Sequence, residues 1–361
     1  MPAAQSTIHP ADHPAHQNTG ISPLVNSDTS SPIPKTMQAV TQNAYGSAEA
    51  LQCATVDTPV PAGKEILIEV HAAGMDKGTW YLMSGKPYLI RLAGFGFSKP
   101  KQAVPGLDVA GKVVAVGSEV TRFNIGDEVY GIAKGSFADY ATASEDKLVL
   151  KPANLTFEEA AVATVSGITA LEALADQGKL QADQHVLVVG ASGGVGSYTV
   201  QLAKAHGAQV SAVASASKAA LVASLGADHV IDYRSDYLTN SKTQYDLIID
   251  IGGRNRVSHL RRLLTPTGTL VFVGGEGGNR FTGGIGRQLF ASLMSVFYKQ
   301  SLRMFVSTEK LAMMERFRKF LESGEVRPSV GARFALNDVP QAMRQLEAGQ
   351  ISGKAVIVVR S

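Results

Sequence analysis

The chain has very little cysteine and no long apolar segment. Cys53 is its only cysteine among 361 residues, which excludes an internal disulfide and a four-cysteine zinc site. A single thiol favours a reducing compartment, so we expect a cytoplasmic location. No apolar run reaches the roughly 18 residues that a membrane-spanning helix needs. We therefore expect no membrane partner.

An excess of charge of one sign is also lacking. The chain carries 34 basic and 31 acidic residues, a formal net charge of +3. It has no cluster of Lys and Arg interleaved with aromatic residues, so a nucleic-acid partner is not expected. Hydrophobic residues make up 45% and charged residues 18%, which is typical of a soluble globular protein. The length suits two domains.

The first 36 residues lack hydrophobic periodicity and are rich in Pro, Ser, Thr, His and Asn. This composition predicts a disordered tail. The tail contains no Arg, which a mitochondrial transit peptide needs, and no apolar stretch of the kind found in secretory signals. We interpret His9, His13 and His16 as part of a polar tail rather than as metal ligands. The folded protein is expected to begin at Met37.

Two patterns of secondary structure follow the tail. Up to about Ala160, short strands such as Ile66–Val70 and Val109–Val116 alternate with Gly and Pro turns, which predicts a small β barrel. Thr156 and Glu159 have the spacing of a capping box at the start of a helix. From His185 onward strands alternate with helices, which predicts βαβ units and a parallel sheet.

Two late segments carry further expectations. The most apolar one, Leu289–Val306, is interrupted by Lys299, Gln300 and Arg303, and we predict a core helix followed by a turn. A terminal strand at Ala355–Val359 is expected to rejoin the first domain.

A glycine-rich segment, Gly190–Gly196, follows the predicted strand His185–Val189. Glycines permit a sharp turn and the close approach of a pyrophosphate, and the following helix presents free N–H groups and its positive dipole end. Ala191 stands where the fingerprint usually has its first glycine, and it can serve there if its φ is negative. The turn residues that we expect to bind a dinucleotide are Ala191, Ser192, Gly193, Gly194, Val195 and Gly196.

The residues at the end of the next predicted strand, Gln209–Ala214, indicate whether NAD or NADP is bound. NAD sites place an Asp or Glu there to bind the ribose 2′-hydroxyl. Residues 213–218 contain no acid, whereas Ser215, Ser217 and Lys218 offer two hydroxyls and a cation that suit a 2′-phosphate. The sequence therefore predicts NADP(H). The alternative for Lys218 is an ordinary solvated helix lysine.

Seven motifs occur in a fixed order: Ala72–Gly74, Pro105–Gly111, Gly126–Val129, Ser166–Ala170, the glycine turn, Leu225–Asp228 and Gly353–Val356. Together they resemble the medium-chain dehydrogenase/reductase superfamily, in its zinc-free quinone oxidoreductase and enoyl reductase branch. The resemblance implies an α/β protein with an N-terminal chaperonin-10-like (GroES-like) β barrel domain and a Rossmann doubly wound parallel sheet. It implies a catalytic domain at 37–160, completed by 327–361, and an NADP(H)-binding Rossmann domain at 161–326.

The resemblance also implies a homodimer, because relatives commonly pair through the edges of their Rossmann sheets. Thr269–Val273 is a candidate for such an edge strand, and an internal position is the alternative. Zinc enzymes of the family carry a Cys after the Ala-Ala-Gly strand and a His-Glu pair in the Pro-Gly motif. The corresponding segments here read Gly74-Met75-Asp76 and Leu107-Asp108, so we expect no bound metal.

The resemblance also implies cofactor-binding roles for individual residues. Lys218 and Tyr233 are 15 positions apart (233 − 218), which is the spacing of the pair that usually grips the 2′-phosphate. Thr169 and Asp76 correspond to positions beside the nicotinamide. Asp76 replaces a usual Asn and Thr79 replaces a usual Asp, so the local hydrogen bonding is expected to differ from the family pattern.

Two tyrosines are candidates for the catalytic proton donor, Tyr81 and then Tyr88. For both, aromatic packing in the wall of the cleft is the alternative. The implied function is zinc-independent, NADPH-dependent reduction of quinones or α,β-unsaturated carbonyls by hydride transfer to a small apolar electrophile. Two alternatives stay open: an alcohol or carbonyl oxidoreductase that works without zinc, and a non-enzymatic NADPH-binding module.

Overall fold

The computed structural model describes residues 32–235, 237–275 and 281–360. The predicted disordered tail lies, up to residue 31, outside these ranges. The first strand, β1 (Thr36–Thr41), begins where the sequence predicts the start of the folded part. Residues from Pro34 onward form one compact unit.

One sheet joins the N-terminal strands to the end of the chain. Its seven strands include β14 (Val330–Ala335), β15 (Lys354–Val358), β3 (Glu65–Met75), β4 (Asp108–Val116), β5 (Glu128–Ile132) and β7 (Leu148–Leu150) in that order, with β6 (Tyr140–Ser144) paired to β3. β15 runs antiparallel to β3, which is the return of the last strand that the sequence predicts. A separate ladder pairs β1 with β2 (Gln52–Asp57). These strands form the GroES-like part of the fold.

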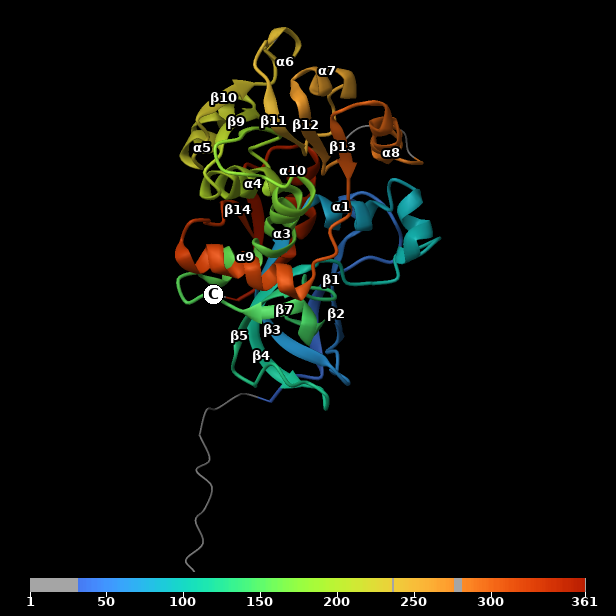
Figure 1. Cartoon of the computed structure of the whole chain (residues 1–361). Helices are drawn as coiled ribbons and strands as arrows, with labels where there is room; N and C mark the ends of the chain where they lie inside the picture. Colours follow the sequence, from blue (N-terminus) through green and yellow to red (C-terminus); the bar gives the residue numbers. More distant parts are fainter. Residues whose placement is uncertain (1–31, 236, 276–280, 361) are drawn as a thin grey trace, which may run out of the picture. The chain divides into compact units, whose positions relative to one another are not determined.

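The second sheet has six strands, and every pairing in it is parallel. Its order is β10 (His229–Asp232), β9 (Gln209–Ala214), β8 (His185–Val189), β11 (Tyr245–Asp250), β12 (Leu264–Phe272) and β13 (Ser301–Met304). Numbered from β8, this is the doubly wound order 3-2-1-4-5-6 of a Rossmann sheet. The predicted α/β fold class is therefore confirmed (Figure 1).

Helices connect these strands and cover them. The longer ones are α1 (Lys77–Ser84), α3 (Thr164–Glu172), α4 (Gly194–Ala205), α8 (Ile285–Met294), α9 (Leu311–Ser323) and α10 (Val339–Glu347); the shorter ones are α2 (Phe157–Ala161), α5 (Ala219–Ser224), α6 (Tyr237–Asn240) and α7 (Val257–Arg262). The predicted capping box is present at α2, where Thr156 and Glu159 exchange hydrogen bonds. Such a cap stabilises a helix by about 1 kcal/mol.

Close packing of helices explains why position 167, in the motif Ser166–Ala170, is a glycine. α3 packs against α4 and α9. A Cβ at Gly167 in α3 would lie only 2.1 Å from the Phe317 ring of α9. The glycine therefore allows the two helices to approach, and any larger residue would push the ring away.

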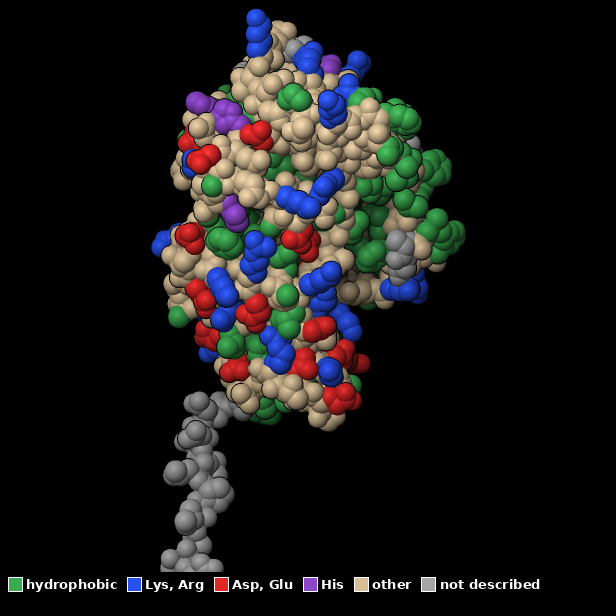
Figure 2. Space-filling view, viewed as in Figure 1, with side chains coloured by type: hydrophobic (Ala, Val, Ile, Leu, Met, Phe, Trp, Pro, Cys, Tyr) green, Lys and Arg blue, Asp and Glu red, His purple; other side chains and the backbone are tan. Residues whose placement is uncertain are grey.

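Two expectations about the late chain need revision. β12 lies between β11 and β13, so the segment at Thr269 is internal rather than an edge strand. The predicted core helix at Leu289–Val306 is wrong: the segment contains the end of α8 and the strand β13, and Leu289, Phe290 and Leu293 are each more than half exposed. Figure 2 shows hydrophobic side chains gathered over α8. Among the described residues, no helix has the length and hydropathy to cross a membrane.

Candidate cofactor and active site

The glycine turn links β8 to α4 and has the geometry that its glycines predict. Gly190 has a φ of +92°, which favours glycine. The backbone N–H groups of Gly190 and Ala191 donate to the carbonyl of Val213 in β9, at 3.1 and 3.0 Å. A Cβ at Gly196 would lie 2.2 Å from the Gly190 oxygen. Ala191 is buried and does not have a positive φ, so alanine is tolerated there.

This turn can hold a dinucleotide. Gly193 caps α4 without a side-chain hydrogen bond, and the first turn of the helix contains no acid. An anion can therefore approach the free N–H groups and the positive end of the helix dipole. The turn also stands at the carboxyl end of β8, between β9 and β11, where the strand order reverses. Doubly wound sheets bind their ligands at that point.

The hydroxyl and lysine side chains predicted for the 2′-phosphate follow β9 directly. The hydroxyls of Ser215 and Ser217 lie 3.1 Å apart. Lys218 is half-buried, and its Nζ donates to the carbonyls of Gly349 and Ile351 at 3.1 and 2.8 Å. Burial lowers the pKa of Lys218. The lysine is therefore held by the C-terminal segment of the chain.

Tyr233 follows the neighbouring strand β10. Its backbone N–H donates to the Ala214 carbonyl at 3.1 Å, so the ends of β9 and β10 lie side by side. Its side chain is 55% exposed. The Arg234 guanidinium lies 5.3 Å from the centre of the Tyr233 ring. Arg234 is thus a second cation near this end; the sequence did not predict it, although its place next to Tyr233 was a usable signal.

Asp76 and Thr79, the two departures from the family pattern, are hydrogen-bonded to each other. Asp76 is the N-cap of α1, and its Oδ1 accepts from the Thr79 backbone N–H at 2.8 Å and from the Thr79 hydroxyl at 3.2 Å. Asx caps of this kind satisfy a helix N–H that has no partner within the helix. Asp76 and Thr79 together therefore cap the first turn of α1.

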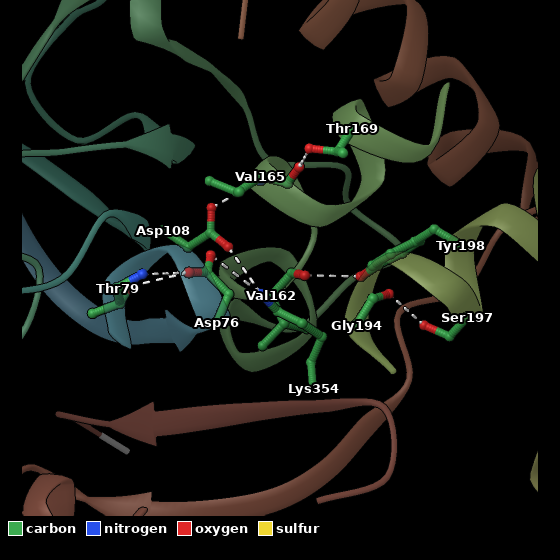
Figure 3. A network of polar contacts seen from close by, with 10 residues as sticks. All are labelled: Asp76, Thr79, Asp108, Val162, Val165, Thr169, Gly194, Ser197, Tyr198 and Lys354. Carbon is green, nitrogen blue, oxygen red and sulfur yellow. Dashed lines mark hydrogen bonds and ion pairs between the residues drawn. The ribbon is translucent and has the colours of Figure 1, made fainter. Parts of the chain in front are cut away.

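Asp76 also belongs to a buried charged cluster that the sequence analysis did not identify. Lys354 in β15 donates to Asp108 Oδ2 in β4 at 3.3 Å, and its Nζ lies 3.7 Å from Asp76 Oδ2. Asp108 Oδ1 accepts from the Val165 N–H of α3 at 2.9 Å. Figure 3 shows the three side chains pointing toward one another. Asp108 and Lys354 lie in the sequence motifs at Pro105 and Gly353, which was the only signal available.

Burial dominates the ionisation of this region. It raises the pKa of Asp108 to about 6, with Lys354 opposing the rise and Asp76 adding to it. Burial likewise raises the pKa of Glu309 to about 7, where Lys147 opposes the rise and the carboxylates of Asp108, Glu172 and Asp76 add to it. Perturbed carboxyl groups of this kind are common at functional sites.

The remaining predicted site residues occupy helical or turn positions. Thr169 on α3 is half-buried, and its hydroxyl donates to the Val165 carbonyl at 2.7 Å. Tyr81 is half-buried on α1, with its ring 5.2 Å from that of Trp80. Tyr88 packs edge-on against Phe281 at 5.5 Å and lies under the Arg91 guanidinium at 4.7 Å. These contacts favour the packing interpretation for Tyr88.

Comparisons with known proteins agree with this architecture. The family described as alcohol dehydrogenase GroES-like domain matches residues 62–153, and the family described as zinc-binding dehydrogenase matches residues 225–357. The chain is 35% identical over 346 residues to the 2-methylene-furan-3-one reductase of Solanum lycopersicum, covering 91% of this chain and 81% of the relative. The chain belongs to the medium-chain dehydrogenase/reductase superfamily, in its quinone oxidoreductase branch.

Two further members of the superfamily support this placement. The chain is 33% identical over 352 residues to the chloroplastic NADPH-dependent alkenal/one oxidoreductase of Arabidopsis thaliana, covering 93% of this chain and 83% of the relative. The solved structure of the quinone oxidoreductase from Coxiella burnetii superposes with a TM-score of 0.77 at 28% identity, covering 90% of this chain and 100% of the other.

One of the family descriptions names zinc. Within the ranges that the structure describes, no three His, Cys, Asp or Glu side chains form a group that could hold a metal ion. The position of the superfamily's zinc-binding histidine is Leu107 here, which has no ligand atom. Zinc independence stays a prediction.

Proposed function

We propose that this protein is a zinc-independent reductase that uses NADPH to reduce quinones or α,β-unsaturated carbonyls. The observation that carries the cofactor choice is the acid-free end of β9. Ser215, Ser217 and Lys218 follow that strand, and Tyr233 follows the strand beside it. Two hydroxyls, a cation and a phenol stabilise a phosphate dianion, whereas NAD sites need a carboxylate there.

The substrate class is supported by the names of two relatives, a 2-methylene-furan-3-one reductase and an alkenal/one oxidoreductase. Both names describe compounds with a carbon–carbon double bond conjugated to a carbonyl group. Reduction needs a hydride at the electron-poor carbon and a proton elsewhere on the molecule. The bound cofactor would supply the hydride, so the chain's own residues must position the carbonyl group and deliver the proton.

Tyr81 is the residue that we propose as the donor of that proton. It projects from α1, the helix that Asp76 caps. Asp76 in turn belongs to the charged cluster whose Lys354 lies against the glycine turn. A phenol is a suitable donor because it stabilises negative charge that develops on a carbonyl oxygen during hydride transfer. Tyr88 is the weaker candidate since its ring is engaged with Phe281 and Arg91.

An acceptor screen tests the function. The purified full-length protein, mixed with NADPH and a panel of quinones, enones, aldehydes and ketones, should consume NADPH with the first two classes. The consumption is followed at the absorbance of reduced nicotinamide, and NADH should be a far poorer donor. Turnover of aldehydes or ketones alone, unaffected by chelators, would instead support a zinc-free carbonyl oxidoreductase. Tight NADPH binding without any turnover would support a non-enzymatic module.

Tyr81→Phe removes the proposed proton donor while keeping the ring. General acid catalysis contributes about 100-fold or more, so kcat for the best acceptor should fall by that order while the Kd for NADPH stays unchanged. Tyr88→Phe is the matched control on the neighbouring segment, and its kcat should stay within about threefold of wild type. Equal kcat values for Tyr81→Phe and the wild type would assign Tyr81 to packing.

A further inference from the structure

Three charged side chains are buried together beside the cofactor turn, and their charges do not balance. Asp108 is fully buried, the Lys354 side chain is 1% exposed, and the Asp76 side chain is 9% exposed. One lysine therefore faces two carboxylates. Buried charges are normally matched, because an unmatched one costs several kcal/mol.

Asp76 is the unmatched partner. Its Oδ1 accepts hydrogen bonds from Thr79, but Oδ2 is buried and finds no hydrogen-bond donor among the residues that the structure describes. Within the described part of the chain, its charged contact is the longer one to Lys354, at 3.7 Å against 3.3 Å for Asp108. Lys354 is thus paired mainly with Asp108. The carboxylate of Asp76 then gives the cluster an excess negative charge whenever neither carboxylate carries a proton.

This cluster touches the predicted anion-binding turn directly. A Cβ at Gly194 would lie 2.8 Å from Lys354 Cδ and 3.1 Å from the Ser166 hydroxyl. The residue before the lysine, Gly353, donates its backbone N–H to the Ser192 carbonyl in the turn at 2.8 Å. A charge on the cluster therefore acts at short range on an anion held by the turn.

We propose that Asp76 makes dinucleotide binding at the glycine turn proton-linked, so that the cluster takes up a proton when the anionic cofactor binds and affinity falls as pH rises. This proposal rests on the proposed binding of a nicotinamide dinucleotide at the turn. Asp76 is a positioning residue in this scheme, because it acts on the cofactor through Lys354.

The charged groups around Asp76 give the direction of the effect. Lys354 from β15 is the cation, and Asp108 from β4 accepts the proton, since burial raises its pKa to about 6 with Asp76 adding to the rise. Glu309 and Glu172 add negative charge to the same region, and Lys147 opposes them. Tyr198 on α4 stays protonated because burial raises its pKa. A bound pyrophosphate favours the protonated cluster, so binding is stronger below about pH 6 and weaker above it.

Asp76→Asn is the decisive variant. Asparagine caps a helix as well as aspartate does, so α1 and the Thr79 contact should survive, which the thermal midpoint checks. Its loss of charge also removes one cause of the raised pKa of Asp108. The experiment is titration calorimetry of the full-length wild type and variant with NADPH, and with NADH, between pH 5.5 and 8.5 in buffers of different ionisation enthalpy. Comparing the two proteins cancels the titration of the ligand's own phosphate.

The wild type should take up a fraction of a proton on binding near pH 6 to 7, and its affinity should fall about three- to tenfold more across the range than that of Asp76→Asn. Asp57→Asn, on the exposed face of β2, is the charge-matched control and should behave as wild type. Glu309→Gln tests the other titrating carboxyl, and the Asp76-dependent difference should persist in its background. Equal pH slopes and equal proton uptake in wild type and Asp76→Asn would overturn the proposal. Absence of any dinucleotide binding by wild type would overturn the proposed function as well.

Discussion

Gly196→Ala should weaken dinucleotide binding severely, with the Kd for NADPH rising about 100-fold or more. The added Cβ would lie 2.2 Å from the Gly190 oxygen and 2.7 Å from the Ala191 Cα. Both are backbone atoms, so the clash can be relieved only by moving the turn. A displacement of about 1 Å in a positioned binding site costs on the order of 100-fold.

The measurement is the Kd for NADPH by quenching of protein fluorescence, with the thermal midpoint of the ligand-free protein as a check on folding. Gly286→Ala, within α8, is the matched control, because among the described side chains its new Cβ contacts the Thr282 hydroxyl at an ordinary 3.5 Å. That control should bind NADPH as the wild type does. A Gly196→Ala protein that folds and binds with unchanged Kd would remove the turn from the cofactor site.

Lys218→Glu should reverse the preference for NADPH. The substitution replaces a cation by an anion at the end of β9, where the 2′-phosphate is proposed to bind. Losing one charged partner of a phosphate and adding a repulsive one should weaken NADPH binding about 100-fold, whereas NADH, which lacks that phosphate, should change less than about threefold. The ratio of kcat/KM for the two cofactors measures the effect.

Two further variants separate charge from structure at this position. Lys218 donates to the carbonyls of Gly349 and Ile351, so its replacement also removes local hydrogen bonds. Lys218→Gln keeps a donor group without the charge and should lose most of the NADPH preference while keeping the thermal midpoint. Lys242→Glu makes the same change of charge at an exposed position just before β11 and should alter neither Kd. Parallel losses of NADPH and NADH affinity in Lys218→Glu would exclude a specific role for Lys218.

Prediction from the sequence succeeded where the signal was local. The strand His185–Val189, the turn after it and the capping box at Thr156 depend on neighbouring residues, and the structure has each of them. It failed for Leu289–Val306, because apolar composition alone does not say whether a helix faces a core or the surface. The structure shows that Leu289, Phe290 and Leu293 of α8 are exposed.

The charged cluster is a clearer example of what the sequence could not predict. Lys354 and Asp108 are 246 positions apart, and no periodicity or spacing connects them. They meet because β15 returns to pair with β3, which brings Lys354 to Asp108 of β4, to Asp76 and to Gly194. Lys218 likewise finds its two carbonyl partners more than 100 positions later in the chain.

The sequence by itself determined the superfamily, the two kinds of sheet and the glycine turn, because strand periodicity, helix capping and glycine conformation act over a few residues. It also carries the prediction of NADP(H), through the missing acid after β9. Only the tertiary structure decided which charges are buried together, which apolar side chains stay exposed, and that Lys354, the ion-pair partner of Asp76, lies against the glycine turn. Those properties depend on which distant segments are packed together, and burial sets the energy of a charge only once that packing exists.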